Sequence, residues 1–254
     1  MLGINTNVPS LTAQKNLGSS SASINTSIAR LSSGLRINSA RDDAAGLAIA
    51  TRMSSEVRGS EVAKRNTNDG ISALQIADGA LASMTDGVQR MRELAVQAAT
   101  GTLTTDDRTN LLAEFDALGA QLTDIATDTK FNGVSLLTGT PANLAIQTGA
   151  NSGDTTTVNL VNGSTIATAV DGADISTAAA ATTALTTIDA QLTALNTGRA
   201  TIGAGINRLD AVVSNLDTTV TNVSAARGRI MDADFAKETA NLTRTQILQQ
   251  AGTA

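Results

Sequence analysis

The chain has 254 residues, of which 41% are hydrophobic and 1% aromatic, and its formal net charge is −5. It contains no cysteine and no histidine, which excludes disulfides, thiolate zinc sites and iron–sulfur ligation and removes the commonest general base. Its basic residues form no tract suited to a phosphate backbone, and no window of about eighteen apolar residues is long enough to cross a membrane. The composition therefore disfavours a globular enzyme, a nucleic-acid ligand and membrane insertion.

The first 33 residues carry a weakly apolar helical pattern, with Leu17, Ile24, Ile28 and Leu31 among Ser, Asn and Thr. Residues 232–254 show a similar pattern. Short helices with so little apolar surface are marginal alone. We therefore expect the two segments to pair with each other or with neighbouring copies.

Residues 44–99 predict a long helix. Its apolar residues fall three, four or seven positions apart, which is typical of a helix packed along a narrow seam. They include Ile71, Leu74, Leu81, Met84, Val88 and Met91. Residues 101–107 then predict a turn, with Thr105 or Asp106 as the N-cap of a second helix. That helix carries Leu111, Phe115, Leu118, Leu122 and Ile125 on one face.

The middle of the chain, residues 138–176, is the predicted β region. Residues 144–147 and 156–160 alternate in polarity around a turn-rich segment at 149–154, which predicts a hairpin. Residues 161–175 predict another short strand and loop.

The longest regular pattern covers residues 185–223, where apolar residues alternate steps of three and four, interrupted only by Arg199. A strict period of 3.5 residues predicts a left-handed coiled bundle, with a helix on the order of 60 Å long. Arg199 would occupy a seam position and must reach solvent or a carboxylate. The predicted fold is mainly α, a long antiparallel coiled-coil-like helical hairpin bundle with a small β-hairpin region in the middle of the chain.

Candidate chemical groups are few. The pairs Asp42–Asp43 and Asp106–Asp107 precede helices, where acidic side chains favour the helix N-terminus, so we interpret them as capping groups. The segment 149–154 lacks the Lys-Ser/Thr ending of a phosphate-binding loop. We predict no catalytic, cofactor-binding or metal-binding residue, and no enzymatic activity.

One stripe of the first long helix suggests an interface. Arg90, Leu94 and Gln97 lie at positions i, i+4 and i+7, beside the Val88–Met91 seam, and we expect them to face outward. A basic residue beside an exposed leucine is typical of an interface hot spot, although an ordinary solvated face has the same spacing.

Several motifs, in order along nearly the whole chain, resemble those of bacterial flagellins. Residues 30–50, RLSSGLRINSARDDAAGLAIA, resemble the N-terminal signature of that family. Further similar motifs lie at 5–7, 65–72, 131–133, 207–209, 230–236 and 249–253. The related hook–filament junction protein is an alternative, and the long heptads alone also permit a signalling or adaptor coiled coil.

The resemblance implies a division into layers. Residues 1–33 with 232–254 would form an inner-tube domain, and because flagellins usually continue past the 249–253 motif, we expect its C-terminal end to be truncated. Residues 34–137 with 177–231 would form a helical bundle domain, to which 138–176 add a β-hairpin and loops. About forty residues separate the helical halves, too few for a large outer domain.

The resemblance also implies a function. The chain would polymerise into the flagellar filament for swimming motility, with itself, an export chaperone, the filament cap and the hook-junction proteins as partners and no cofactor. It would be secreted through the flagellar type III apparatus, in keeping with an N-terminus that lacks the features of a cleaved signal peptide.

A last implication concerns an innate immune receptor, toll-like receptor 5. In recognised flagellins the stripe described above makes the main receptor contact and also packs between filament subunits. The matching residues here are Gln89, Arg90, Arg92, Leu94, Gln97 and Glu114.

Overall fold

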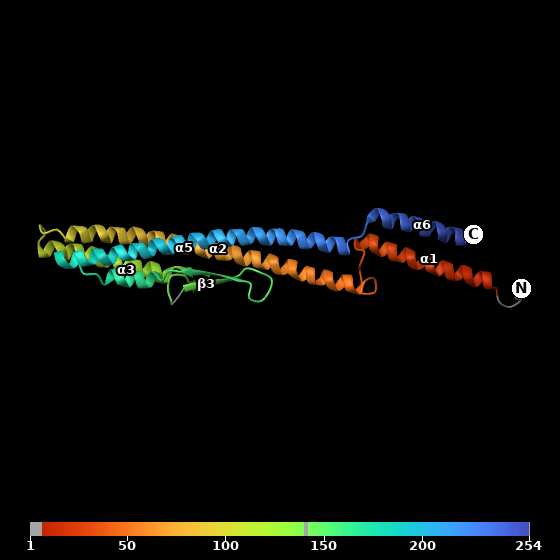
Figure 1. Cartoon of the computed structure of the whole chain (residues 1–254), viewed down its shortest axis with the longest axis horizontal. Helices are drawn as coiled ribbons and strands as arrows, with labels where there is room; N and C mark the ends of the chain where they lie inside the picture. The colour runs from red at the N-terminus through yellow and green to blue at the C-terminus, as the bar shows by residue number, and fades with distance from the viewer. Residues whose placement is uncertain (1–6, 140–141, 254) are drawn as a thin grey trace. The chain divides into compact units, whose positions relative to one another are not determined.

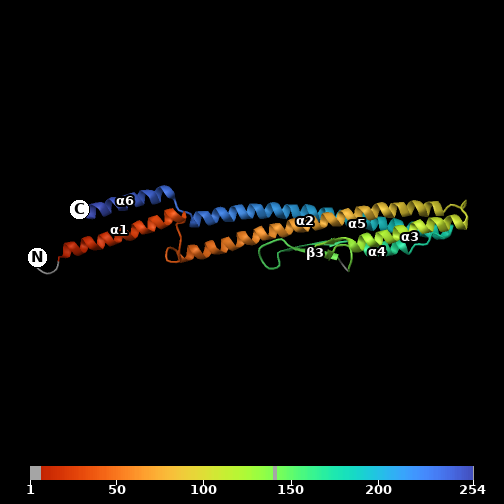
Figure 2. The same ribbon diagram turned by 180° about the vertical axis from the view of Figure 1, so that it is seen from behind.

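The computed structural model describes residues 7–139 and 142–253 (Figures 1 and 2). The motif residues Asn5 and Thr6, together with Pro141 and Ala254, lie outside the described residues. Contacts divide the chain into unit 1, residues 1–58 with 218–254, and unit 2, residues 59–217. Within the described ranges, no helix has an apolar stretch long enough to cross a membrane.

In unit 1, helix α1 (Val8–Ser33) lies side by side with helix α6 (Phe235–Thr253), as both ribbon views show. The helices are antiparallel, since Ser27 bonds to Glu238 near one end and Gln249 bonds to Ser21 near the other. Of the two pairings predicted for the chain ends, the structure contains the one within a single chain.

Local signals set the ends of α1. The Asn7 side chain accepts a hydrogen bond from the Ser10 amide at 3.1 Å, and Gly34, with φ of 71°, ends the helix by donating to the Arg30 carbonyl. The following chain is joined to the end of α5 (Ala178–Met231) and to the α5–α6 connection by backbone hydrogen bonds, from Arg36 to Met231 at 2.6 Å and from Ala233 to Gly34 at 2.9 Å.

Both predicted acidic pairs contribute helix caps. Asp43 accepts from the Gly46 amide at 2.8 Å at the start of α2 (Ala44–Ala98). At the start of α3 (Thr105–Asp128), Asp107 forms a capping box with Thr104. The predicted N-cap at Thr105 or Asp106 is wrong, because only Thr104 places its hydroxyl three residues before an acidic side chain that can reach back to its amide.

The antiparallel packing of α2 on α5 (Ala178–Met231) confirms the predicted helical architecture. Three ion pairs join the two helices within unit 2. They link Lys64 to Asp217 at 2.6 Å, Asp78 to Arg199 at 2.9 Å and Arg92 to Asp189 at 2.6 Å. The residue numbers of the paired side chains fall along α5 as they rise along α2, so the two helices run in opposite directions.

The core of unit 2 follows the predicted seam. Side chains with essentially no exposed surface come from all three long helices, and they include Leu74, Leu81, Met84, Val88, Met91, Phe115, Leu122, Ile188, Leu195, Ile202 and Leu209. At the predicted seam position, Arg199 is half-buried and reaches a carboxylate as expected, by pairing with Asp78 at 2.9 Å, while the neighbouring Gly198 is buried.

The predicted hairpin is confirmed. Strands β3 (Ala142–Gln147) and β4 (Thr155–Leu160) pair antiparallel, with Leu144 opposite Val158. A second, two-residue pair, β1 (Lys130–Phe131) with β2 (Val134–Ser135), was not predicted. Its turn is Asn132-Gly133, both with positive φ, which is a common hairpin turn sequence.

The strand predicted within 161–175 is wrong, because this segment forms helix α4 (Gly163–Asp171). The Asn162 side chain caps it by accepting from the Thr165 amide at 3.1 Å. Its buried residues, Gly163, Ile166, Ala167 and Val170, recur at three and four positions, the period of a helix rather than a strand.

The β3–β4 hairpin and the residue after it meet the long helices at glycines. A Cβ atom at Gly205 would lie 2.8 Å from Val158, and one at Gly198 would lie 2.7 Å from Val161. Gly70 in α2 meets Ile146 in the same way. Apolar side chains of this region therefore rest directly on helix backbone.

Candidate interaction surface

The predicted contact residues lie on α2 and α3, and the structure brings two of them into direct contact. Arg90 donates to Glu114 Oε1 from Nε at 3.0 Å and from Nη2 at 2.8 Å. A third bond runs from Arg90 Nη1 to Glu93 Oε2 at 2.9 Å. The hydrogen bonds that Arg90 donates to Glu114 and Glu93 raise its pKa further above the usual value. Both Arg90 and Glu114 remain about half exposed.

The turn between α2 and α3 places Glu114 beside Arg90. Arg108 fixes this turn by donating to three carbonyls, those of Ala98 at 3.0 Å, Thr100 at 2.7 Å and Leu103 at 3.0 Å. The short turn predicted neighbouring helices, but the role of Arg108 was missed, because spacing does not reveal which carbonyls a tight turn leaves unpaired.

Leu94 does not face outward as predicted. Only 1% of its surface is exposed, and it belongs to the core cluster with Met91 and Ala98. Because a helix advances about 100° per residue, Leu94 lies about 40° from Arg90 in the direction of Met91 and Ala98. That rotation carries it into the core, whereas Arg90 stays at the edge.

The other predicted residues on α2 are exposed, and they divide between two sides of the helix. Arg92 pairs with Asp189 of α5, whereas Arg90 pairs with α3. Gln89 and Gln97 are exposed as expected. An exposed apolar side chain, Val96, lies four residues after Arg92 and is 50% exposed, a feature that sequence reasoning missed.

Elsewhere the acidic side chains have local structural partners. Hydrogen bonds from Thr104 and Ser39 lower the pKa values of Asp107 and Asp42, respectively. In the part of the chain that the structure describes, no three His, Cys, Asp or Glu side chains come together as a group able to hold a metal ion. The exposed polar and charged side chains of α2 and α3 are suited to contact with the surface of another protein.

Two family profiles match the chain. The bacterial flagellin N-terminal helical region matches residues 4–142, and the bacterial flagellin C-terminal helical region matches residues 185–254. The flagellin of Halalkalibacterium halodurans is 44% identical over 99% of this chain and 93% of its own length. The flagellin of Listeria innocua is 38% identical over 97% and 92%. An alignment with Flagellin A of Vibrio cholerae, 33% identical, covers 100% of this chain and 95% of the relative over 360 positions, so more than a hundred have no counterpart here.

Solved structures agree. The crystal structure of Bacillus cereus flagellin is 36% identical and matches with a TM-score of 0.54 over 64% of this chain and 94% of that one. A putative flagellar hook-associated protein from Vibrio parahaemolyticus has a TM-score of 0.63 over 75% of this chain and 100% of that one, but at 17% identity it shows the fold alone. The family profiles and the more identical relatives thus favour a flagellin over a junction protein or a signalling coiled coil. The chain belongs to the bacterial flagellins in a short form, a non-enzymatic structural subunit of the extracellular flagellar filament that serves motility.

Proposed function

We propose that the free flagellin chain is bound by toll-like receptor 5 through the α2–α3 patch. This patch is defined here as Gln89, Arg90, Arg92, Gln97 and Glu114. The observation that carries the proposal is the Arg90–Glu114 pair, two half-exposed side chains on neighbouring helices joined at 2.8 Å. The resemblance of these positions to those of recognised flagellins supplies the identity of the receptor.

The pair presents a prearranged donor group to a partner. A guanidinium has five N–H donors, and three of those of Arg90 are used within the chain. The remaining two are free to meet an acceptor on the receptor, and the flanking carboxylates already hold the planar group in place. Leu94 takes part from beneath, as a buried side chain that supports the helix surface, rather than as a contact residue.

The binding test uses the variant Arg90→Ala and the control Lys64→Ala. Each substitution removes a partly exposed cation from α2, Arg90 with its two ion pairs and Lys64 with its one, but Lys64 lies outside the patch. We expect Arg90→Ala to weaken receptor binding about thirtyfold, the loss typical of a central interface residue, while Lys64→Ala binds as the parent does. Titration calorimetry of the monomer with the purified receptor ectodomain measures both; equal affinities for the two variants would refute the proposal.

We also infer the remaining partners and layers from family membership. The terminal segments 1–33 and 232–254 would form the inner tube, residues 34–137 with 177–231 the surrounding bundle, and 138–176 its hairpin. Export through the type III apparatus with a chaperone, and contact with the filament cap and hook-junction proteins, follow from the same membership. Seeded polymerisation viewed by negative-stain microscopy tests the subunit role: long tubes are expected, and a defined dimer or trimer would contradict it.

A further inference from the structure

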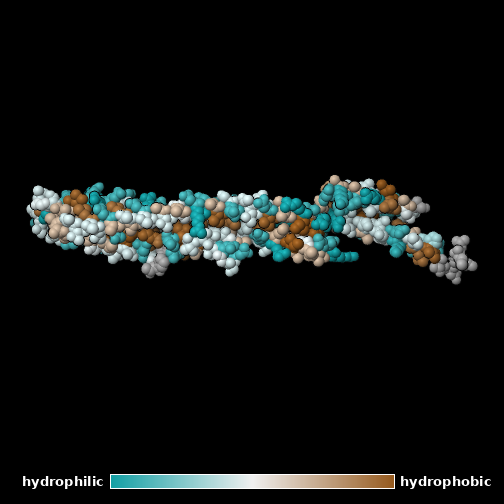
Figure 3. All heavy atoms as spheres, in the orientation of Figure 1, coloured by the Kyte–Doolittle hydropathy of each residue, from teal (hydrophilic) through white to brown (hydrophobic). Residues whose placement is uncertain are grey.

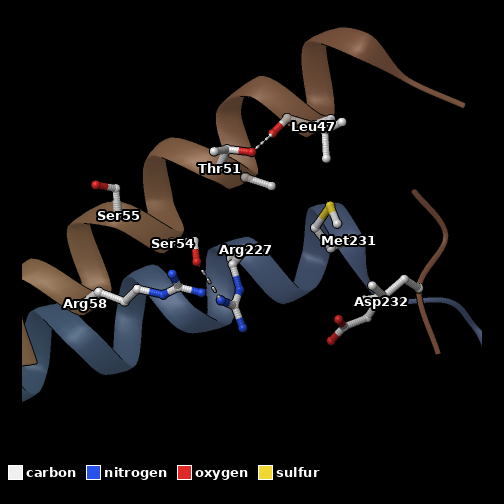
Figure 4. A pocket seen from close by; sticks show the side chains of 10 residues that line it. Leu47, Thr51, Ser54, Ser55, Arg58, Arg227, Met231 and Asp232 are labelled. Carbon is white, nitrogen blue, oxygen red and sulfur yellow. Dashed lines mark hydrogen bonds between the residues drawn. The ribbon is translucent and has the colours of Figure 1, made fainter. Parts of the chain in front are cut away.

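Unit 1 contains a groove that the functions above do not use. It lies between the first turns of α2 and the last turns of α5 and has a volume of about 520 Å³ (Figure 4). Its lining includes the apolar side chains of Leu47, Ala50 and Met231. Thr51 and Ser55 of α2 border it.

Two guanidinium groups flank this apolar lining. Arg58 projects from α2 and Arg227 from α5, so the two cations lie at the same side of the groove (Figure 4). Arg227 donates one long bond, of 3.4 Å, to Ser54 Oγ. No carboxylate in the described residues lies within ion-pair distance of either group. The carboxylate of Asp232 also lines the groove, so the two guanidinium groups leave its lining with a net charge of +1. The groove therefore combines apolar surface with a net positive charge.

A complementary group is present on the same unit. The chain has three phenylalanines: Phe115 is fully buried and Phe131 is half-buried, whereas Phe235 is 67% exposed. Phe235 is the first residue of α6, and the preceding Asp234 accepts the amide of Lys237 at 3.1 Å. The ring thus lies at the start of a helix, beside a carboxylate. On the face drawn in Figure 3, hydrophobic residues form separate patches among hydrophilic ones. A partner surface can therefore bind a single exposed apolar side chain such as Phe235.

We propose that Phe235 of one copy docks into this groove of a neighbouring copy in the filament. The ring would lie on Leu47 and Met231, with the guanidinium of Arg58 or Arg227 over its face and near the carboxylate of Asp234. The inference rests on the filament-subunit function and names one contact within it. Anchor and groove are different surfaces of the same chain, so the contact is heterologous and repeats from copy to copy, as a helical filament requires.

Disulfide trapping in the full chain tests the contact directly, because the chain has no cysteine of its own. The double variant Phe235→Cys with Thr51→Cys is polymerised on parent seeds and mildly oxidised. We expect a ladder of covalent trimers and longer oligomers on a non-reducing gel. The matched control, Ile247→Cys with Thr51→Cys, places the second cysteine at another exposed position of α6, 59% exposed in the parent, and should give no ladder.

Other gel patterns would overturn the proposal. Equal ladders from both variants would mean random collision, and covalent dimers without longer species would mean a reciprocal contact. An oxidised species that remains a monomer would show Phe235 reaching the groove of its own chain. Polymers of the double variant with no crosslink would show that the ring lies elsewhere.

The polymerisation equilibrium provides a second readout. Phe235→Ala should raise the critical concentration for polymerisation about thirtyfold, and Arg58→Gln by a smaller factor, about two to five. Both side chains are exposed, so the melting temperature of the monomer should stay unchanged. If the parent polymerises and Phe235→Ala polymerises equally well, the groove contact is wrong. A parent chain that fails to polymerise would overturn the subunit assignment as well.

Discussion

Glu238 is a buried carboxylate near one end of the α1–α6 pair. It accepts from Ser27 Oγ at 3.0 Å and from Arg30 Nη1 at 2.9 Å. Ser27 and Glu238 are also the buried residues of these two helices, with 6% and 8% of their surface exposed. A shift of one helix along the other would leave the carboxylate buried without these partners, which is costly. The polar contact therefore specifies the register of two helices that have little apolar surface to specify it.

The pH dependence of helix pairing follows from the same group. Burial raises the pKa of Glu238, but hydrogen bonds from Arg30 and Ser27 outweigh it and hold the pKa below 4.5. A lowered folded-state pKa stabilises the pair above the unfolded value, and that stability is lost as the pH falls through the folded value. We expect the helical circular dichroism of the polymerised parent, in which both helices are folded, to fall between about pH 5 and pH 3, and that of polymerised Glu238→Gln to show a weaker dependence. Identical titrations of the two proteins would contradict this role.

The buried side chain of Leu94 should contribute to the stability of the monomer. Because it is buried, Leu94→Ala should leave a cavity and lower the free energy of unfolding by about 2–5 kcal/mol. The control Val96→Ala truncates an exposed side chain two residues away and should change the stability by no more than about 0.5 kcal/mol. Urea unfolding of both monomers measures the difference. A Leu94→Ala variant as stable as Val96→Ala would restore the outward interpretation.

Among the elements, charge alternates along the α2–α5 contact. Lys64, Asp78 and Arg92 lie two heptads apart on α2, and each meets an opposite charge on α5. Sliding α2 by two heptads would bring like charges toward each other, so the pattern disfavours that wrong register. Exposed pairs of this kind add little stability, and their contribution is to alignment.

The packing of the β3–β4 hairpin against helix α5 should depend on a glycine at position 205. Gly205→Ala places a methyl group 2.8 Å from Val158, and we expect overpacking to lower the free energy of unfolding by about 1–3 kcal/mol. Gly203→Ala on the same helix meets nothing within 4 Å and should raise it by up to about 1 kcal/mol, since alanine favours a helix. Thermal unfolding of the two variants should therefore shift in opposite directions. Two shifts of the same sign would show that the hairpin does not depend on close contact with the helix backbone.

For the whole molecule, the two chain ends carry the least apolar burial. In α1 and α6 the buried residues are polar, and Val8, Leu11, Ile247 and Leu248 are more than half exposed. Helices with so little tertiary packing gain their stability from partners.

We therefore predict that residues 1–33 and 232–254 are disordered in the dilute monomer and become helical in the filament. Hydrogen exchange of the monomer should show these amides unprotected, while those of the core positions in α2, α3 and α5 stay protected. The same amides should gain protection after seeded polymerisation. Strong protection of both ends in the dilute monomer would contradict the prediction.

The long helices, the β3–β4 hairpin and the family could all be predicted from the amino-acid sequence. Periods of 3.5 and 2 are local properties, and the 30–50 signature requires no fold to be read. The α4 segment was misread because a nine-residue helix has little room to show its period, and its cap, Asn162, resembles a turn residue. The contact residues on α2 were found by spacing, but spacing alone placed Leu94 on the wrong side of the surface.

Which neighbour each side chain contacts depends on how the helices pack, and the sequence pattern did not reveal it. Helix α3 packs beside α2, so Arg90 forms an ion pair with Glu114 of α3 and Leu94 is buried in the core. Gly198 is buried because Val161 lies against the helix backbone there, and Arg199 beside it pairs with Asp78. The groove beside Arg58 and Arg227 exists because residues far apart in the sequence converge. Hydrophobic period gives the angle of a residue on its own helix, whereas burial also depends on where the other helices lie.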